Sequence, residues 1–224
     1  MNTLRNLAPC AVIAAALAAC GGGGDAPPAT YAVNVAQRHL LVDGGSWTMN
    51  GTGPNGVAFT VTMDFAPATT GPFPVSGATA GQSLQTFTVQ ASGSSDSAAQ
   101  TIYFDPLNLA LVGAESGGTC SVGNSSAALP ASAMLGAGGT FFSGSDLDGC
   151  TGASNTVGST TIAWALESDH GVALLCWNLA FKDALGAPSG TQSNCVEVAT
   201  DGSLGTRARF AVSALGLTVT ARNF

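Results

Sequence analysis

The chain has few charged residues and very few bases. Asp, Glu, Lys and Arg make up 8% of its 224 residues, where about 25% is typical of a globular protein. After Cys20 there are 13 acids but only five bases, namely Arg38, Lys182, Arg207, Arg209 and Arg222. Because nucleic-acid binding needs clustered Lys and Arg, this balance argues against a nucleic-acid partner. The scarcity of Glu and Lys also argues against a helical protein, whose exposed faces favour these residues.

Several features that would indicate specific chemistry are also absent. The apolar run at residues 11–19 is shorter than the ~20 residues that cross a bilayer as a helix. No G-x-S-x-G motif occurs, so an α/β-hydrolase is not indicated. No two cysteines stand in C-x2-C spacing, and His39 and His170 are remote from them in the sequence, which argues against zinc. We therefore predict no metal, no cofactor and no catalytic residue.

The N-terminus is typical of an exported protein. Arg5 and the apolar run after it have the order of a secretory signal peptide. The run ends in the motif LAAC at residues 17–20, which resembles the lipobox of bacterial lipoproteins. The resemblance implies diacylglycerol on the Cys20 thiol, cleavage before Cys20 and acylation of the new amino group. The alternative is an ordinary cleaved signal that contains a cysteine.

The lipobox divides the chain into a signal peptide at residues 1–19, a lipidated tether at 20–30 and one β-rich domain at 31–224. The tether is rich in Gly and Pro, and as a flexible chain it would reach roughly 20 Å. In Gram-negative lipoproteins, Asp directly after the lipidated cysteine favours the inner membrane. The residue here is Gly21, so the resemblance implies attachment to the outer membrane through the N-terminal lipid. Two or more acyl chains make such anchoring stable.

The remaining cysteines predict disulfides. Once Cys10 leaves with the signal and Cys20 is acylated, an even number remains, namely Cys120, Cys150, Cys176 and Cys195. In an exported chain this predicts two disulfides, for which three connectivities exist. Proximity in the sequence favours the pairs Cys120–Cys150 and Cys176–Cys195.

Alternating apolar residues predict strands. Residues 57–65 (VAFTVTMDF) alternate with a period of two, which is typical of a half-buried strand, and they follow a shorter strand at 46–50. The intervening GTGPNG at 51–56 matches the dinucleotide motif G-x-G-x-x-G. That motif requires a helix after the glycines; a strand follows here, so we interpret the segment as a hairpin turn. Residues 172–181 are almost continuously apolar and predict a central strand.

Together these features predict an all-β fold, either an antiparallel β-sandwich or an open barrel, with one short N-terminal helix. The helix is expected over residues 34–42, where Asn34 and Gln37 resemble a capping box. The hairpin at 47–65 parallels a second one at 164–181, which is consistent with two related halves. We expect polar loops or turns at residues 91–96 and 182–194.

Three residues are candidates for ligand binding. Asp146 and Asp148 lie in the most acidic short loop, at residues 145–150, which resembles part of a calcium-binding loop. The first position of that loop would be Gly144, which has no side-chain ligand, so a solvated turn is the favoured interpretation. Trp47 is a candidate for stacking on a sugar, whereas Trp164 and Trp177 fit the apolar alternation of core strands.

The segment TQSNCVEVATDGSLGTRARF before the last predicted strand is similar to the tail of outer-membrane lipoproteins of Gram-negative bacteria, a resemblance that implies no activity. We therefore expect a lipid-anchored envelope lipoprotein that acts as a structural module or binds a ligand, an envelope protein or a glycan. The alternative is a hydrolase or carbohydrate-binding protein acting on envelope polysaccharide or peptidoglycan. Glu167, Asp169 and His170 are the nearest approach to a catalytic group, and a surface turn is the favoured interpretation for them.

Overall fold

The structure is a computed structural model, and it describes residues 29–53, 56–151, 154–214 and 216–224. The helical elements are α1 (Val33–Arg38) and the π-helix η1 (His39–Asp43). The strands are β1 (Thr30–Tyr31), β2 (Gly45–Thr52), β3 (Ala58–Phe65), β4 (Thr69–Pro72), β5 (Thr79–Ala91), β6 (Ser94–Phe104), β7 (Leu111–Ser116), β8 (Thr119–Ser126), β9 (Ala133–Met134), β10 (Gly138–Leu147), β11 (Thr156–Asp169), β12 (Val172–Asp183), β13 (Pro188–Val198), β14 (Leu204–Ala214) and β15 (Leu217–Arg222).

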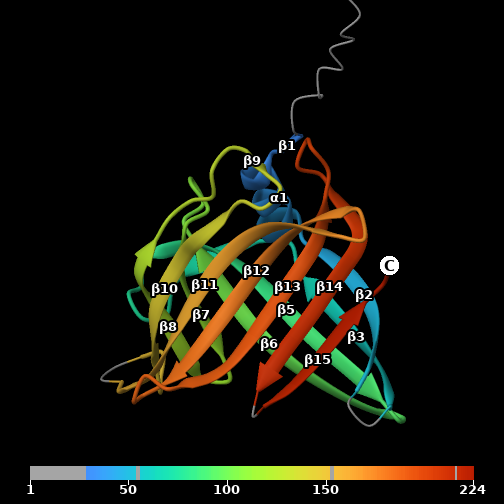
Figure 1. The fold of residues 1–224 in the computed structure, drawn as a ribbon. Helices are drawn as coiled ribbons and strands as arrows, with labels where there is room; N and C mark the ends of the chain where they lie inside the picture. Colours follow the sequence, from blue (N-terminus) through green and yellow to red (C-terminus); the bar gives the residue numbers. More distant parts are fainter. Residues whose placement is uncertain (1–28, 54–55, 152–153, 215) are drawn as a thin grey trace, which may run out of the picture.

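The strands form one large antiparallel β-barrel of 12 strands (Figure 1). The hydrogen-bonded order is β3-β2-β15-β14-β13-β12-β11-β10-β8-β7-β6-β5, and pairing of β3 with β5 closes the ring. β3 pairs with residues 85–91 of β5, and the short strand β4 pairs with residues 79–82 of the same strand. The all-β prediction is confirmed, and of the two predicted architectures the barrel is the nearer one, although it is closed where an open barrel was expected.

Apolar residues face the inside of this barrel and small polar residues face outward. In β11, Ile162, Trp164 and Leu166 are buried, as their alternation predicts. The predicted central strand is β12, which lies between β11 and β13 and is buried on both faces over much of its length. Hydroxyl side chains such as Thr48 and Thr62 bond to each other on the outer face, and they suit contact with water.

The helical segment α1–η1, residues 33–43, closes one end of the barrel; we call it the helical plug (Figure 1). Val33, Ala36, Leu40 and Leu41 are at most 4% exposed and belong to the main core. The predicted helix is confirmed, but its capping box is wrong. Ala32 occupies the N-cap position without a side-chain hydrogen bond, because burial in the barrel, rather than local capping, holds this short helix in place.

The N-terminal strand β1 lies beside the helical plug and pairs with β9. The first described residues are therefore at the closed end of the barrel (Figure 1). The turns between β5 and β6, between β7 and β8 and between β12 and β13 are at the opposite, open end, which we call the mouth.

The strands near the mouth are longer than the sequence analysis expects. The turn predicted at 91–96 is present but shorter, because only Ser92 and Gly93 separate β5 from β6. Both have positive φ, 50° and 80°, which is the conformation of a tight type I′ hairpin. The loop predicted at 182–194 is likewise present but shorter, since β12 continues to Asp183 and β13 begins at Pro188. These strand ends carry polar residues on both faces, so their sequence has no alternation to reveal them.

Both predicted disulfides are present, with the connectivity favoured by sequence proximity: Cys120–Cys150 and Cys176–Cys195. Cys176 and Cys195 are directly opposite each other on β12 and β13, so this bond pins two neighbouring strands as expected. Across the described residues, no helix has the length and apolar character needed to cross a membrane.

Candidate functional site

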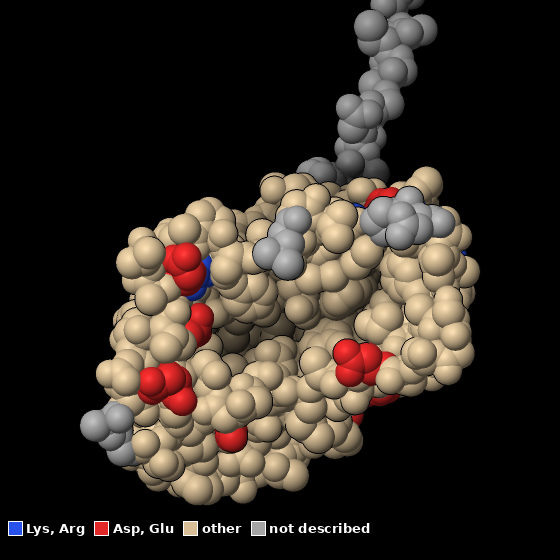
Figure 2. Space-filling view, turned by 90° about the horizontal axis from the view of Figure 1, so that it is seen from below, with Lys and Arg blue, Asp and Glu red and all other residues tan. Residues whose placement is uncertain are grey.

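The mouth opens into a cavity of about 530 Å³ inside the barrel (Figure 2). Its lining comes from eight strands, β5 to β8 and β10 to β13: Phe87, Ala98, Ala99, Gln100, Ala114, Ser116, Thr119, Ser121, Asp146, Val157, Gly158, Thr160, Phe181, Lys182, Asp183, Ser189 and Gln192. Pockets for small molecules usually measure about 300–1,000 Å³. The cavity therefore has the size of a ligand site.

The barrel is hollow at this end because its inward residues there are small. A 12-stranded barrel is wider than the eight-stranded barrels whose side chains just fill the interior. At the closed end the helical plug and large side chains such as Trp164 and Trp177 fill the space. Near the mouth the inward positions are instead residues such as Ala98, Ala114 and Ser116, which leave the centre open.

The cavity floor is apolar, and its walls are mixed. Below the mouth, the interior narrows to a space of about 40 Å³ bounded by Ile102, Leu111, Phe142, Ile162 and Leu179 among others. Higher up, Phe87 and Phe181 line the wall. The ring of Phe87 on β5 also contacts the ring of Phe210 on β14, with the ring centroids 5.7 Å apart. β5 and β14 are not adjacent in the barrel wall. A bound molecule would thus meet rings and aliphatic groups below and polar groups around the mouth.

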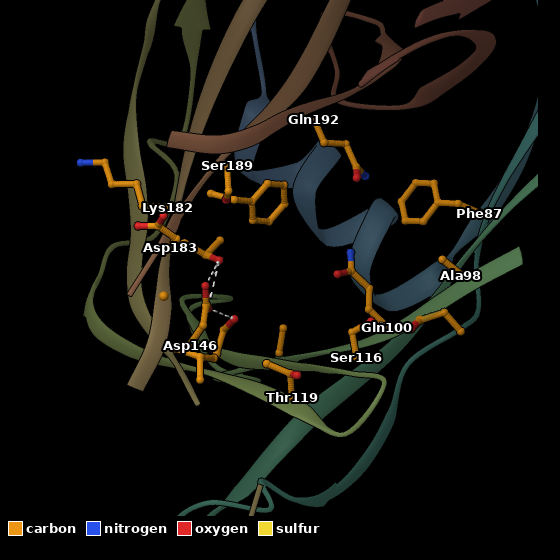
Figure 3. Close-up of a pocket in the computed structure, with 17 residues that line it drawn as sticks. Phe87, Ala98, Gln100, Ser116, Thr119, Asp146, Lys182, Asp183, Ser189 and Gln192 are labelled. Atoms are coloured by element: carbon orange, nitrogen blue, oxygen red, sulfur yellow. Dashed lines mark hydrogen bonds between the residues drawn. The ribbon is translucent and has the colours of Figure 1, made fainter. Parts of the chain in front are cut away.

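Asp146 carries the carboxylate that faces the cavity (Figure 3). It lies within β10, between Ser121 on β8 and Gly158 on β11. Its oxygens accept hydrogen bonds from the hydroxyls of Ser121 and Thr160. The solvated-turn interpretation is therefore wrong for Asp146, because β10 continues to Leu147 and turns this side chain inward.

Gly158 lies directly opposite Asp146, on β11. A Cβ atom at Gly158 would lie 3.4 Å from Asp146 Oδ2 and only 2.4 Å from the backbone oxygen of Lys182. No real Cβ tolerates the second distance, so a larger residue would push β11 away from β12. The glycine therefore permits the close pairing of β11 with β12 next to the Asp146 carboxylate.

Two glutamines place amide groups at the cavity wall (Figure 3). Gln100 Nε2 donates to Gln85 Oε1 at 2.8 Å, and Gln192 Nε2 donates to Asn194 Oδ1 at 3.0 Å. Gln85 and Asn194 are buried. Each cavity glutamine is thus held by a buried amide behind it and has its remaining hydrogen-bonding capacity free for a bound molecule.

The other two predicted ligand-binding residues are elsewhere. Asp148 lies on the turn after β10, where its carboxylate accepts hydrogen bonds from the side chain and backbone of Asn155 at 2.9 and 2.8 Å. These hydrogen bonds lower the pKa of Asp148. Trp47 is 5% exposed and packs edge-on against Phe65. Its indole N–H donates to the backbone oxygen of Gly205 at 2.9 Å, so its ring lies in the core away from the cavity.

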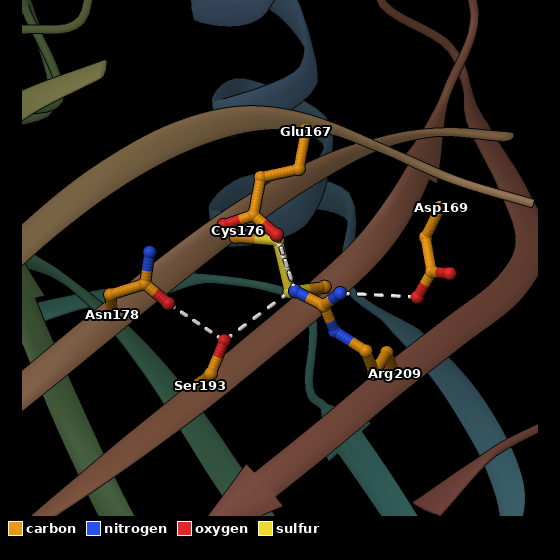
Figure 4. Close-up of a disulfide and its surroundings, with 7 residues drawn as sticks. Glu167, Asp169, Cys176, Asn178, Ser193 and Arg209 are labelled. Carbon is orange, nitrogen blue, oxygen red and sulfur yellow. Dashed lines mark hydrogen bonds and ion pairs between the residues drawn. A yellow bond between two sulfur atoms is a disulfide. The ribbon is translucent and has the colours of Figure 1, made fainter. Parts of the chain in front are cut away.

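An ion-pair cluster covers the Cys176–Cys195 disulfide on the outer face of the barrel (Figure 4). The Arg209 guanidinium bonds to Glu167 and, at 3.1 Å, to Asp169. Burial opposes the charge of Arg209, but these two carboxylates outweigh it, so the pKa of Arg209 is raised. Glu167 and Asp169 share one face, as the alternation of a strand requires, and both bond to Arg209. Asp169 also lies 3.6 Å from Nε2 of His170, whose side chain is exposed on the turn after β11.

The same cluster contains the group of three metal-ligating side chains found among the described residues: Glu167, Cys176 and Cys195. Both sulfurs are bonded to each other, and a disulfide has no thiolate to offer a metal. The group is therefore a covered disulfide and not a metal centre.

Sequence analysis identified Asp146 among the cavity residues but missed Phe87, Gln100, Phe181 and Gln192. Their alternation indicates which face of a strand they occupy, but not which end of the barrel the helical plug leaves empty. The predicted lipidation site, Cys20, lies outside the described residues. Chemically, the cavity can hold a small molecule against aromatic and amide groups, with one carboxylate at its wall. No protein-family model, no curated protein and no solved structure matches this chain.

Proposed function

We propose that this protein is a lipid-anchored binding protein of the bacterial cell envelope that holds a small molecule in its barrel. The observation that carries the proposal is the cavity itself: about 530 Å³, closed below by core residues and open at the mouth. Barrels that enclose a space of this kind commonly hold one small ligand.

The arrangement of the two ends supports this proposal. Thr30, the last residue of the predicted tether, is at the closed end beside the helical plug, and the mouth is at the other end (Figure 1). Anchored through Cys20, the protein would direct its mouth away from the membrane. A ligand could then enter from the aqueous side without meeting the lipid surface.

Binding is better supported than hydrolysis. Glycoside hydrolysis needs two carboxyl groups facing each other across the substrate. Asp183 also lines the cavity, but its Oδ1 accepts the backbone N–H groups of Leu185 and Ala187 and so closes the turn after β12. Asp146 is the carboxylate that remains turned toward the cavity.

Native mass spectrometry of the full chain, extracted from its own cell envelope in mild detergent, tests the proposal. We expect the wild-type chain to carry a non-covalent small molecule, and we expect Ala114→Phe to lose it, because Ala114 lines both the cavity and its floor. Ala98→Trp is a second variant at an exposed position near the mouth, where a large ring is tolerated more easily. A wild-type chain without a bound molecule, or equal occupancy in all three chains, would overturn the proposal.

A further inference from the structure

We propose that the ligand of this cavity is a small organic cation, an amine joined to an apolar body, which binds through Asp146. This inference rests on the proposed function, since it names the class of molecule that the same cavity takes. It is carried by the position of Asp146, whose carboxylate is turned into the cavity and forms no ion pair among the described residues. The other charged lining residues are Lys182, whose amino group points away, and Asp183, which closes the turn after β12.

The Asp146 carboxylate has capacity left for a ligand. Among the described residues it forms no ion pair. Its partners are the hydroxyls of Ser121 and Thr160, which can donate one proton each. An ionised carboxylate offers about four acceptor sites, so a further donor can approach it from the cavity. An ammonium group supplies both such donors and the opposite charge.

The bases of the described chain do not neutralise this carboxylate. Lys182 is the base among the cavity residues, and its amino group points away from the cavity (Figure 3). Arg38 belongs to the helical plug, and Arg207 is exposed on β14, a strand that does not line the cavity. Arg209 and Arg222 pair with Asp169 on the outer face of the barrel. Acidic side chains therefore make the electrostatic potential in the mouth negative. A negative potential raises the local concentration of cations and repels anions.

Acids also surround the entrance to the cavity. Asp183 lines the mouth, and Asp148 lies on the turn after β10. Asp and Glu side chains are visible around the hollow when the molecule is seen from this end (Figure 2). A ligand carrying phosphate or carboxylate would have to enter past these groups and lie against Asp146, at a cost in free energy.

Aromatic rings complete the site. Phe87 and Phe181 line the cavity, and aromatic faces attract cations as well as apolar groups. Below them, Ile102, Ile162 and Leu179 form an apolar floor. A molecule with an amine at one end and a hydrocarbon body at the other would match both the carboxylate and the floor.

Three probes of nearly equal size separate charge from shape: benzylamine, benzyl alcohol and benzoate, which are cationic, neutral and anionic at neutral pH. Each is titrated by calorimetry into the full chain in one non-ionic detergent at low ionic strength. We expect benzylamine to bind at least about tenfold more tightly than benzyl alcohol, from one charged hydrogen bond, and benzoate to bind most weakly. Raising the salt concentration should weaken the binding of benzylamine but not that of benzyl alcohol or benzoate. Equal binding of the three, a preference for benzoate, or no binding of benzylamine would overturn the inference.

The matched variants are Asp146→Asn and, as a control at the closed end of the barrel, Asp201→Asn on the exposed turn between β13 and β14. Asparagine can still accept hydrogen bonds from Ser121 and Thr160, so Asp146→Asn removes the charge while keeping the local contacts. We expect Asp146→Asn to abolish the preference of benzylamine over benzyl alcohol, and Asp201→Asn to leave that preference unchanged. An unchanged preference in Asp146→Asn would overturn the inference.

Failure of this inference differs from failure of the proposed function. If benzyl alcohol binds as tightly as benzylamine and Ala114→Phe abolishes the binding of both, the cavity is a binding site but its ligand is not selected for positive charge. If the wild-type chain carries no molecule from its envelope and none of the three probes binds, both proposals fall.

Discussion

Gln37 Nε2 in the helical plug donates a hydrogen bond to the backbone oxygen of Leu109, 3.2 Å away in the loop between β6 and β7. Gln37 is 1% exposed and Leu109 is 4% exposed, so neither group has access to bulk water. Leu109 also has a φ of 62°, which is uncommon for a residue with a side chain. This one bond ties the helical plug to the wall of the barrel and thereby helps to close the end opposite the mouth.

Replacement of Gln37 by Leu should destabilise the protein by about 1–3 kcal/mol. The substitution keeps the side-chain volume but leaves the Leu109 carbonyl buried without a partner. Chemical unfolding followed by tryptophan fluorescence measures the change. Arg38→Gln, at the next and exposed position, should change the free energy of unfolding by less than about 0.5 kcal/mol. Equal effects of the two substitutions would show that the buried bond has no special role.

Replacement of Arg209 by Met should cost about 2 kcal/mol, because Glu167 and Asp169 would face each other without their shared partner. The side chain of Arg209 is 22% exposed, which places the cost between that of a surface pair and that of a buried one. Arg207→Met is the control, since Arg207 is exposed. Adding Glu167→Gln to the Arg209→Met chain should restore part of the lost stability, and no restoration would contradict the proposed repulsion.

Replacement of both Cys176 and Cys195 by Ala should lower the free energy of unfolding by about 3 kcal/mol. The bond closes a loop with a sequence separation of 19 residues, and the entropy of the unfolded chain rises when it is removed. Urea unfolding of the double variant and of the wild type, with and without reductant, measures the effect. The reductant should destabilise the wild type more than the double variant, which retains only Cys120–Cys150. An equal response of the two chains would contradict the prediction.

Asp148→Asn should lower the thermal unfolding midpoint at neutral pH and have no effect in strong acid. The hydrogen bonds from Asn155 lower the pKa of Asp148 below its ordinary value of 3.8. A carboxylate with a lowered pKa stabilises the fold above pH 3.8, and this contribution is lost as the pH falls through the folded-state value. Melting curves of both chains at pH 7 and in strong acid test this. If the two chains still differ in thermal unfolding midpoint in strong acid, the charge of Asp148 is not the cause of the difference and the prediction is wrong.

Cys20→Ala should abolish incorporation of a palmitate analogue, because the lipobox resemblance assigns the acylated thiol and amino group to Cys20. Cys10→Ala provides a matched control, since Cys10 lies within the predicted signal and its loss should leave labelling intact. In-gel detection of the labelled lipid after cell growth measures both. Continued labelling of Cys20→Ala would exclude Cys20 as the anchor.

Much of the wall of the barrel could be predicted from sequence, because alternation with a period of two is a local property of a half-buried strand. It placed Ile162, Trp164 and Leu166 on one face, and it identified residues 172–181 as a central strand. The disulfides followed from the even number of cysteines and their spacing. These features depend on neighbours along the chain or on covalent chemistry.

Tertiary structure alone decided that the sheet closes, since the pairing of β3 with β5 joins strands whose alternation would equally suit a sandwich. It also decided where the interior is empty. Asp146 lies in a polar stretch typical of a turn, yet β8 and β11 extend β10 past it and turn its carboxylate inward. Trp47 alternates with Met49 on β2, but its burial depends on residues that are distant in the sequence: its ring packs against Phe65 and its indole N–H donates to Gly205. The sequence thus determined the strands and their buried faces, whereas the width of the ring and the position of the helical plug determined which inward residues meet a cavity.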